Sequence, residues 1–241
     1  MPLLEVDDVT VRFGGVTAVN GARFEVEPGT VTGLIGPNGA GKTTLFNVIT
    51  GIQPPTAGRV HFDGRDITRM STYRRAQRGI ARTFQRLEAF GSLSVWENVL
   101  CAAEIHKLWR PGAGAPAQVA RELMDEVGIL DFADAPADAV PTGIARLLEL
   151  ARALAISPRL LLLDEPSSGL GDEETDSFGE LLQRLATRGT TVLMVEHDMD
   201  LVMGVCNHIH VLDFGTIIAS GTPAEIQQDR AVQEAYLGVQ V

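Results

Sequence analysis

Two periodicities alternate along the chain, one typical of strands and one typical of helices. Leu4 to Val11 and Ala22 to Val26 alternate apolar with polar residues, which predicts half-buried strands. Asn20-Gly21 and Pro28-Gly29 carry turn signals. Val31 to Ile35 is a short apolar run that ends at a glycine-rich loop. Strand-like and helix-like segments keep alternating further along the chain, and this order predicts an α/β fold.

A helix is predicted directly after the glycine-rich loop. Apolar residues recur at helical spacing over Lys42 to Thr50, and Gly51 is placed to end the helix. Arg59 to Phe62 then predicts a strand, followed by a turn at Asp63-Gly64. Strand, loop and helix therefore follow one another closely in the first quarter of the chain.

The second half of the chain predicts further strands of the same sheet. Leu160 to Leu163 and Thr190 to Val195 are suited to strands buried on both faces of a parallel sheet. A helical pattern over Glu173 to Ala186 joins them into a βαβ unit. His208 to Leu212 and Thr216 to Ala219 predict a late hairpin.

The middle of the chain has a different character. From about Trp96 to Ala155 the pattern is mostly helical, interrupted at 111–116 and at the Asp-, Ala- and Pro-rich stretch 131–141, which we predict to be flexible joints. We therefore predict one domain over 1–241, with an α/β core and β-subdomain from about 1–90 and 156–241 and a helical subdomain from about 91–155.

Composition removes several classes of protein. The chain has 241 residues, of which 45% are hydrophobic, so it can bury a sizeable core. Cys101 and Cys206 are too few for a disulfide scaffold and predict reduced thiols in the cytoplasm. No apolar run approaches the length of a membrane span. The net charge of −11 argues against a nucleic-acid partner.

The glycine-rich loop matches the pattern G-x-x-x-x-G-K-[ST] and lies between a predicted strand and a predicted helix. Its glycines let successive N–H groups point inward around phosphate oxygens, and the helix N-terminus adds positive potential. Lys42 supplies a full positive charge, and the Thr43 hydroxyl is suited to Mg²⁺. The predicted nucleotide-binding residues of this loop are Gly36, Pro37, Asn38, Gly39, Ala40, Gly41, Lys42, Thr43 and Thr44.

A pair of carboxylates follows the second apolar strand. LLLLDEP (160–166) delivers Asp164 and Glu165 to the end of the sheet, beside the predicted phosphate loop. Asp164 is suited to holding Mg²⁺ directly or through water. Glu165 is placed to polarise an attacking water as a general base. The chain is therefore predicted to hydrolyse a bound nucleoside triphosphate.

These motifs and their order resemble those of the ATP-binding subunits of ABC transporters over essentially the whole chain. Gln85 in RTFQ matches the glutamine of the family's Q-loop, which contacts Mg²⁺ and water. His197 in VEHD matches the switch histidine that contacts the γ-phosphate, and Phe13 in VRFGG matches the aromatic residue that stacks on adenine. ARAL (151–154) matches the segment that follows the family's signature motif.

The signature itself departs from the family pattern. Where the family has L-S-G-G-Q, the chain has Val140-Pro-Thr-Gly-Ile144. Pro141 replaces the serine and Thr142 the first glycine, while Gly143 is retained; Thr142 and Gly143 are the residues left to meet a partner's ATP. Ser168-Gly-Leu-Gly171 also lacks the aspartate that the family often has there. Both changes affect the half-site that this chain offers to another ATPase subunit.

The resemblance implies a P-loop NTPase core with an antiparallel β-subdomain and an inserted helical subdomain. It also implies ATP and Mg²⁺ as cofactors, separate transmembrane permease subunits, a second homologous ATPase subunit in a heterodimer, an extracytoplasmic solute-binding protein acting indirectly, and a place on the cytoplasmic face of the cell membrane. Three segments resemble the branched-chain amino acid importer group, which also includes importers of urea and amides: 78–85, 196–226 and Ala235-Tyr-Leu-Gly238.

Two other classes of function stay open as alternatives. A non-transport ABC switch, of the kind used in DNA repair or translation, usually has a long coiled-coil insertion or two tandem cassettes. A small-molecule P-loop kinase needs an acceptor pocket and a lid, and has no need of Gln85, His197 or the late hairpin.

A separate arginine cluster could mark a partner surface, although we expect most of it to be solvated: Arg74, Arg75, Arg78, Arg82 and Arg86.

Overall fold

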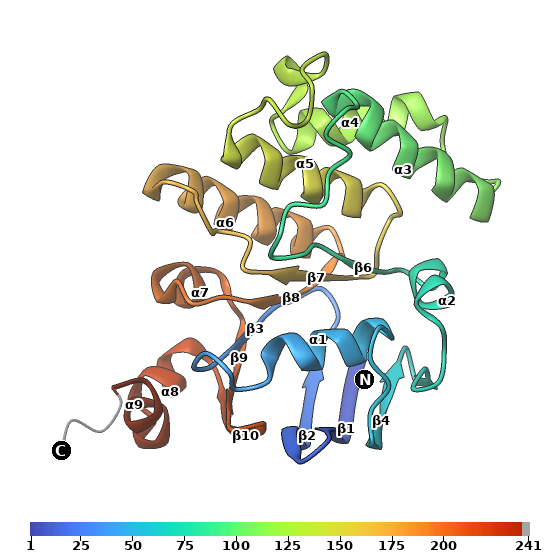
Figure 1. Cartoon of the computed structure of the whole chain (residues 1–241). Helices are drawn as coiled ribbons and strands as arrows, with labels where there is room; N and C mark the ends of the chain where they lie inside the picture. Colours follow the sequence, from blue (N-terminus) through green and yellow to red (C-terminus); the bar gives the residue numbers. More distant parts are fainter. Residues whose placement is uncertain (238–241) are drawn as a thin grey trace.

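The computed structural model describes residues 1–237 and arranges them as two β-sheets with helix α1 (Lys42–Thr50) between them (Figure 1). The larger sheet has the order β10-β9-β3-β8-β7-β6, and its pairs are parallel except β9 with β10. Parallel order places the carboxyl ends of β3, β6, β7 and β8 at one edge. Its strands are β3 (Val31–Ile35), β6 (Ile80–Arg82), β7 (Leu160–Asp164), β8 (Thr191–Val195), β9 (His208–Asp213) and β10 (Thr216–Gly221).

The smaller sheet is antiparallel, with the order β2-β1-β4-β5. Its strands are β1 (Leu4–Phe13), β2 (Val16–Val26), β4 (Ala57–Phe62) and β5 (Arg65–Asp66). The predicted turn at Asn20-Gly21 is wrong, because the hairpin turns at Gly14-Gly15. Gly21 has φ +65° and lies at a bulge inside β2, where the pairing with β1 shifts register. The Asn-Gly pair did mark a left-handed residue, but the strand uses it to bend.

Helices cover the outer face of the larger sheet, and α3, α4 and α5 gather at the end of the molecule away from the smaller sheet (Figure 1). Ala235 to Leu237 of the predicted AYLG segment lie in the last helix, and Gly238 lies outside the described residues. Within residues 1–237, no helix is long and apolar enough to cross a bilayer. The remaining helices are α2 (Thr72–Gln77), α3 (Val95–Trp109), α4 (Pro116–Glu126), η1 (Leu130–Phe132), α5 (Thr142–Leu154), α6 (Asp172–Thr187), α7 (Met199–Val205), α8 (Pro223–Gln228) and α9 (Arg230–Leu237).

The stretch 131–141, which we predicted to be a flexible joint, is hydrogen-bonded to the start of α3. The backbone N–H groups of Val95 and Trp96 donate to the carbonyls of Ala135 and Ala133, both at 2.9 Å. Val95 and Trp96 open α3, and the N–H groups in the first turn of a helix have no partner within the helix. The stretch supplies those acceptors, a role that its composition does not reveal.

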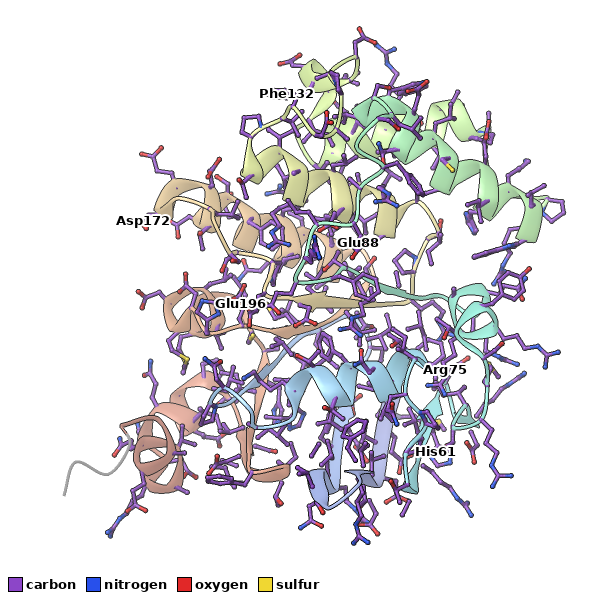
Figure 2. All side chains as sticks on the ribbon, in the orientation of Figure 1. His61, Arg75, Glu88, Phe132, Asp172 and Glu196 are labelled. Carbon is purple, nitrogen blue, oxygen red and sulfur yellow. The ribbon has the colours of Figure 1, made fainter. Side chains whose placement is uncertain are left out.

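Arg75 of α2 lies beside the end of α1 and is buried (Figure 2). Its guanidinium donates to the carbonyls of Val48 and Ile49 at 2.6 and 2.8 Å, and to those of Thr68 and Met70 at 2.9 Å each. The first two carbonyls belong to the last turn of α1, where a positive charge is favourable. Burial lowers the pKa of Arg75 to about 10. Arg75 therefore fixes the C-terminal end of the helix that follows the phosphate loop.

We expect Arg75→Met to lower the free energy of unfolding by about 3 kcal/mol, because buried carbonyls lose their donors. The measurement is the midpoint of urea unfolding. Arg74→Met, at the exposed neighbouring position, is the matched control and should change the free energy by less than about 0.5 kcal/mol. Equal midpoints for the two variants would contradict the assigned role of Arg75.

His210 predicts a pH dependence of stability. Its Nδ1 lies 2.8 Å from Ser220 Oγ and its Nε2 lies 2.9 Å from the Glu25 carbonyl, so the ring fits as the neutral form. Burial lowers its pKa from 6.5 to about 4. Stability from this group is therefore complete above pH 6.5 and decreases as pH falls toward 4, by up to about 1.4 kcal/mol per pH unit. In unfolding experiments from pH 7 to 4, His210→Gln should have a shallower slope than wild type.

Candidate active site

The phosphate loop joins β3 to α1, and its backbone can be built only with glycine at two points. Gly36 has φ +151°, and a Cβ there would lie 2.0 Å from the Leu212 carbonyl oxygen. Gly41 has φ +108°, and a Cβ there would lie 2.4 Å from the Ala18 carbonyl oxygen. Both contacts are with backbone and cannot move aside. Only glycine therefore fits at these two positions, where the loop runs close to the backbone of β9 and β2.

Lys42 lies at the start of α1 and reaches back across the loop. Its Nζ donates to the carbonyls of Gly36 at 2.6 Å and Pro37 at 2.9 Å. Half-burial lowers its pKa, and the negative charges of Glu165 and Asp164 oppose that shift. Gly41 precedes the helix without a side-chain cap, so the first N–H groups, near Thr43 and Thr44, are free of side-chain capping. An ammonium group and uncapped helix N–H groups together suit a polyphosphate.

The two carboxylates lie at the end of β7, next to β8. Every residue of β7 is buried, and Asp164 is 2% exposed. Glu165 has φ +50°, which is uncommon for a residue with a side chain, and its N–H donates to the Val195 carbonyl at 2.9 Å. Such backbone strain is typical of functional sites. Gln85 Nε2 donates to Glu165 Oε2 at 2.7 Å, which leaves the Gln85 amide oxygen available to a cation.

Most of the arginine cluster is exposed or partly exposed, as predicted, since this holds for Arg74, Arg78 and Arg86, but Arg75 and Arg82 are held inside the molecule. The Arg82 side chain is 6% exposed and its Nη2 lies 2.7 Å from Asp164 Oδ2. Arg74 and Arg86 are exposed, as expected. Burial of the two inner arginines depends on acceptors far away in the sequence, which the spacing of arginines alone does not show.

Glu196 at the end of β8 is a residue that the sequence analysis missed (Figure 2). It is 1% exposed, and its Oε1 accepts from the Ser167 N–H at 2.8 Å. Its Oε2 accepts from the N–H of His197 at 3.0 Å. One buried carboxylate therefore holds both the loop after Glu165 and the backbone of His197. The signal was available, because a glutamate directly after a buried strand needs polar partners.

His197, Phe13 and the signature residues occupy three different places. His197 comes shortly after β8, the strand that lies between β3 and β7 in the sheet. Its side chain is 67% exposed, at the sheet edge where the phosphate loop lies. Phe13 is at the tip of the β1–β2 hairpin and is 49% exposed. Thr142 and Gly143 open α5 beside Gly169, in the loop after β7. The larger sheet thus gathers the phosphate loop, Asp164, Glu165, Gln85 and His197, while Thr142 and Gly143 lie next to the β7–α6 loop.

The residues present fit a magnesium nucleotide. The glycine cradle, the uncapped start of α1 and Lys42 provide positive potential after β3, and the buried Asp164 lies at the end of β7, two strands along the same sheet. Thr43 and Asp164 offer a hydroxyl and a carboxylate oxygen, the hard donors that Mg²⁺ prefers. This donor set is suited to ATP and the ion, and it lies along one edge of the larger sheet.

The comparisons with known proteins agree with this geometry. The family described as ABC transporter matches residues 19–168. The family described as branched-chain amino acid ATP-binding cassette transporter matches residues 216–241. The first match covers the phosphate loop and both carboxylates, and the second covers the end of the chain.

Relatives match along the full length. The high-affinity branched-chain amino acid transport ATP-binding protein BraF of Pseudomonas aeruginosa is 40% identical, over 98% of this chain and 98% of its own. The protein LivG of Escherichia coli, which carries the same description, is 37% identical with the same coverage. A nucleotide-free ATP-binding cassette from an ABC transporter has a TM-score of 0.89 at 31% identity, over 99% of this chain and 100% of that one. The chain belongs to the ABC transporter family and is one of its ATP-binding cassette ATPases.

Proposed function

We propose that the chain is the ATPase subunit of an importer for branched-chain amino acids. The observation that carries the choice of solute is the match of residues 216–241 to the branched-chain amino acid cassette family, together with the full-length similarity to BraF and LivG. The solute does not touch this chain in such a system. The proposal therefore assigns the chain to a transporter and leaves recognition of the solute to other subunits.

The geometry supports a division of labour among the site residues. Lys42 and the loop backbone bind the phosphates, and Asp164, Thr43 and the Gln85 oxygen hold Mg²⁺, which neutralises phosphate charge when bound. Glu165 accepts the proton of the attacking water, held in place by Gln85 at 2.7 Å. His197 contacts the γ-phosphate. Phe13, half exposed at its hairpin tip, stacks on the adenine ring.

A groove beside the site is the proposed docking place for a permease. It has a volume of about 360 Å³ and lies between α2, β6, α3 and α5, with Phe84, Ile105 and Trp109 in its lining. Phe84 and Ile105 are 40% and 41% exposed, which favours an apolar partner. Phe84 directly precedes Gln85. A permease segment in this groove would thus act next to the glutamine that holds Glu165, from the cytoplasmic face of the membrane.

Co-purification from membranes of the source organism tests this function. The tagged chain should bring down permease subunits and a second ATPase, and deletion of its gene should abolish leucine uptake. Ile105→Glu should release the permease and leave ATP binding intact, while Ile218→Glu on β10 is the control at another partly exposed position. Loss of urea or amide uptake with normal leucine uptake would reassign the solute. A chain that copurifies with no membrane protein would contradict the transport role.

The signature region supports an asymmetric pair of ATPase subunits. α5 opens at Thr142, and its preceding residue Pro141 provides no side-chain cap. Proline offers neither hydroxyl nor N–H to a phosphate, and the Thr142 side chain crowds a place where the family has glycine. Asp172, Glu173 and Glu174 in the first turn of α6 add negative charge, and a Cβ on Gly143 would lie 2.6 Å from Glu174 Oε1. We propose that this half-site hydrolyses ATP slowly and that the site completed by a partner's signature is the active one.

The isolated chain should accordingly be a weak ATPase at every protein concentration. The measurement is ATPase rate against concentration, with the assembled transporter as reference. Two VPTGI signatures should not form a stable ATP-dependent homodimer, so the rate per subunit should stay flat. A steep rise with concentration, reaching the rate of the transporter, would show that the asymmetric arrangement is wrong.

A further inference from the structure

Arg82 connects two parts of the site that the sequence separates. Its Nη2 lies 2.7 Å from Asp164 Oδ2, at the end of β7. Its Nη1 donates to Asn47 Oδ1 at 2.6 Å, in the helix that follows the phosphate loop. The guanidinium carbon lies 5.4 Å from the centre of the Phe46 ring and 4.8 Å from that of Phe84. The arginine therefore has little freedom to move.

This ion pair is buried, which makes it unlike an ordinary surface pair. The side chains of Arg82 and Asp164 are 6% and 3% exposed. Taking two charges out of water costs free energy that offsets their attraction. Stability alone therefore does not explain why the pair is buried. Two aromatic faces and an amide hold the arginine in one orientation, and the arginine in turn fixes one oxygen of the carboxylate. The attraction between Arg82 and Asp164 therefore holds the carboxylate in one orientation.

Arg82 contacts only Oδ2 of Asp164, so Oδ1 is left to bind a cation. A carboxylate that rotates freely must lose that freedom when it binds a cation, whereas a carboxylate already held by one guanidinium hydrogen bond has less freedom to lose. Arg82 also carries a positive charge, which by itself would weaken binding of a cation nearby. Geometry and charge therefore act in opposite directions, and variants can separate them.

We propose that Arg82 is a positioning residue for the carboxylate that holds Mg²⁺. It ties Asp164 to Asn47 of α1, so that the carboxylate and the phosphate loop keep one relative position. This inference rests on the proposed function, in which Asp164 holds the ion. Loss of Arg82 should therefore reduce the extra ATP affinity that Mg²⁺ provides and leave the affinity for ATP alone unchanged.

The test measures binding of trinitrophenyl-ATP to the purified full chain, in EDTA and in saturating Mg²⁺. Arg82→Lys keeps the charge but cannot reach Asp164 and Asn47 together, so the affinity gain from Mg²⁺ should fall about tenfold or more. The affinity in EDTA should stay at the wild-type value. Arg159→Lys is the matched control, because Arg159 makes a forked pair with Asp63 at 2.7 and 2.9 Å on the exposed surface.

Three further variants make the outcome decisive. Asn47→Ala removes one acceptor of Arg82 and should give a smaller loss in the same direction, which keeps the test valid if Arg82→Lys fails to fold. Arg82→Gln removes the charge; a gain in the effect of Mg²⁺ would show that Arg82 acts only through charge and would overturn the proposal. A full Mg²⁺ effect in Arg82→Lys, or in Asn47→Ala where the lysine variant is unfolded, would also overturn it. Asp164→Asn distinguishes failure of the inference on Arg82 from failure of the proposed function. An unchanged Mg²⁺ effect in this variant would show that Asp164 does not hold the ion.

Discussion

Glu165→Gln should bind ATP as wild type does and hydrolyse it about 10²-fold more slowly or worse, the size expected for loss of a general base. The amide has nearly the same shape as the carboxylate, and its oxygen can still accept the bond from Gln85 that is 2.7 Å long in the wild type. Its position after β7, at φ +50°, needs no change. The substitution removes only the ability to take the proton of the attacking water. The measurement is single-turnover ATP hydrolysis in the assembled transporter.

Glu180→Gln is the matched control for this experiment. Glu180 lies on the exposed face of α6, in an exposed pair with Arg184, and its loss should leave the rate unchanged. His197→Ala should also slow hydrolysis, with a modest loss of ATP affinity. If Glu165→Gln hydrolysed ATP at the wild-type rate, another residue would have to be the base, and the strained backbone at Glu165 would need a different explanation.

Local patterns predicted most of the elements that carry the site. The glycine loop, the helix over Lys42 to Thr50 and the strand ending at Asp164 all depend on neighbouring residues, and each forms as predicted. The reason is that each of these elements is indicated by the residues of its own short segment. A buried parallel strand also shows itself directly, because both of its faces are apolar.

Interactions between distant positions were not predictable in the same way. Arg82 pairs with Asp164, 82 positions away, and Arg75 donates to carbonyls 26 and 27 positions away. An arginine in a polar segment is usually solvated, so its burial follows only from the tertiary structure. Glu196 differs, because a glutamate directly after a buried strand is itself a signal that the side chain needs polar partners.

Lys42→Ala should remove most of the stabilisation that ATP gives to the folded chain. With Mg²⁺-ATP at about 100 times its dissociation constant, wild type should gain about 2.7 kcal/mol, and a variant with a roughly hundredfold weaker affinity should gain only about 0.4 kcal/mol at the same concentration. The ammonium is the fixed positive charge inside a loop otherwise made of N–H dipoles. The measurement is the shift of the thermal unfolding midpoint with added ATP.

Lys107→Ala is the matched control, because Lys107 is the other lysine of the chain and lies on α3 away from the phosphate loop. Both variants lose a lysine charge, so a general effect of net charge on ATP would appear in both. In the unliganded molecule Lys42 donates to the carbonyls of Gly36 and Pro37. Its removal could also loosen the loop, and the unliganded midpoints of the two variants measure that effect separately. An equal ATP shift in wild type and Lys42→Ala would mean that the nucleotide does not bind in this loop, and the assignment of the site would fail with it.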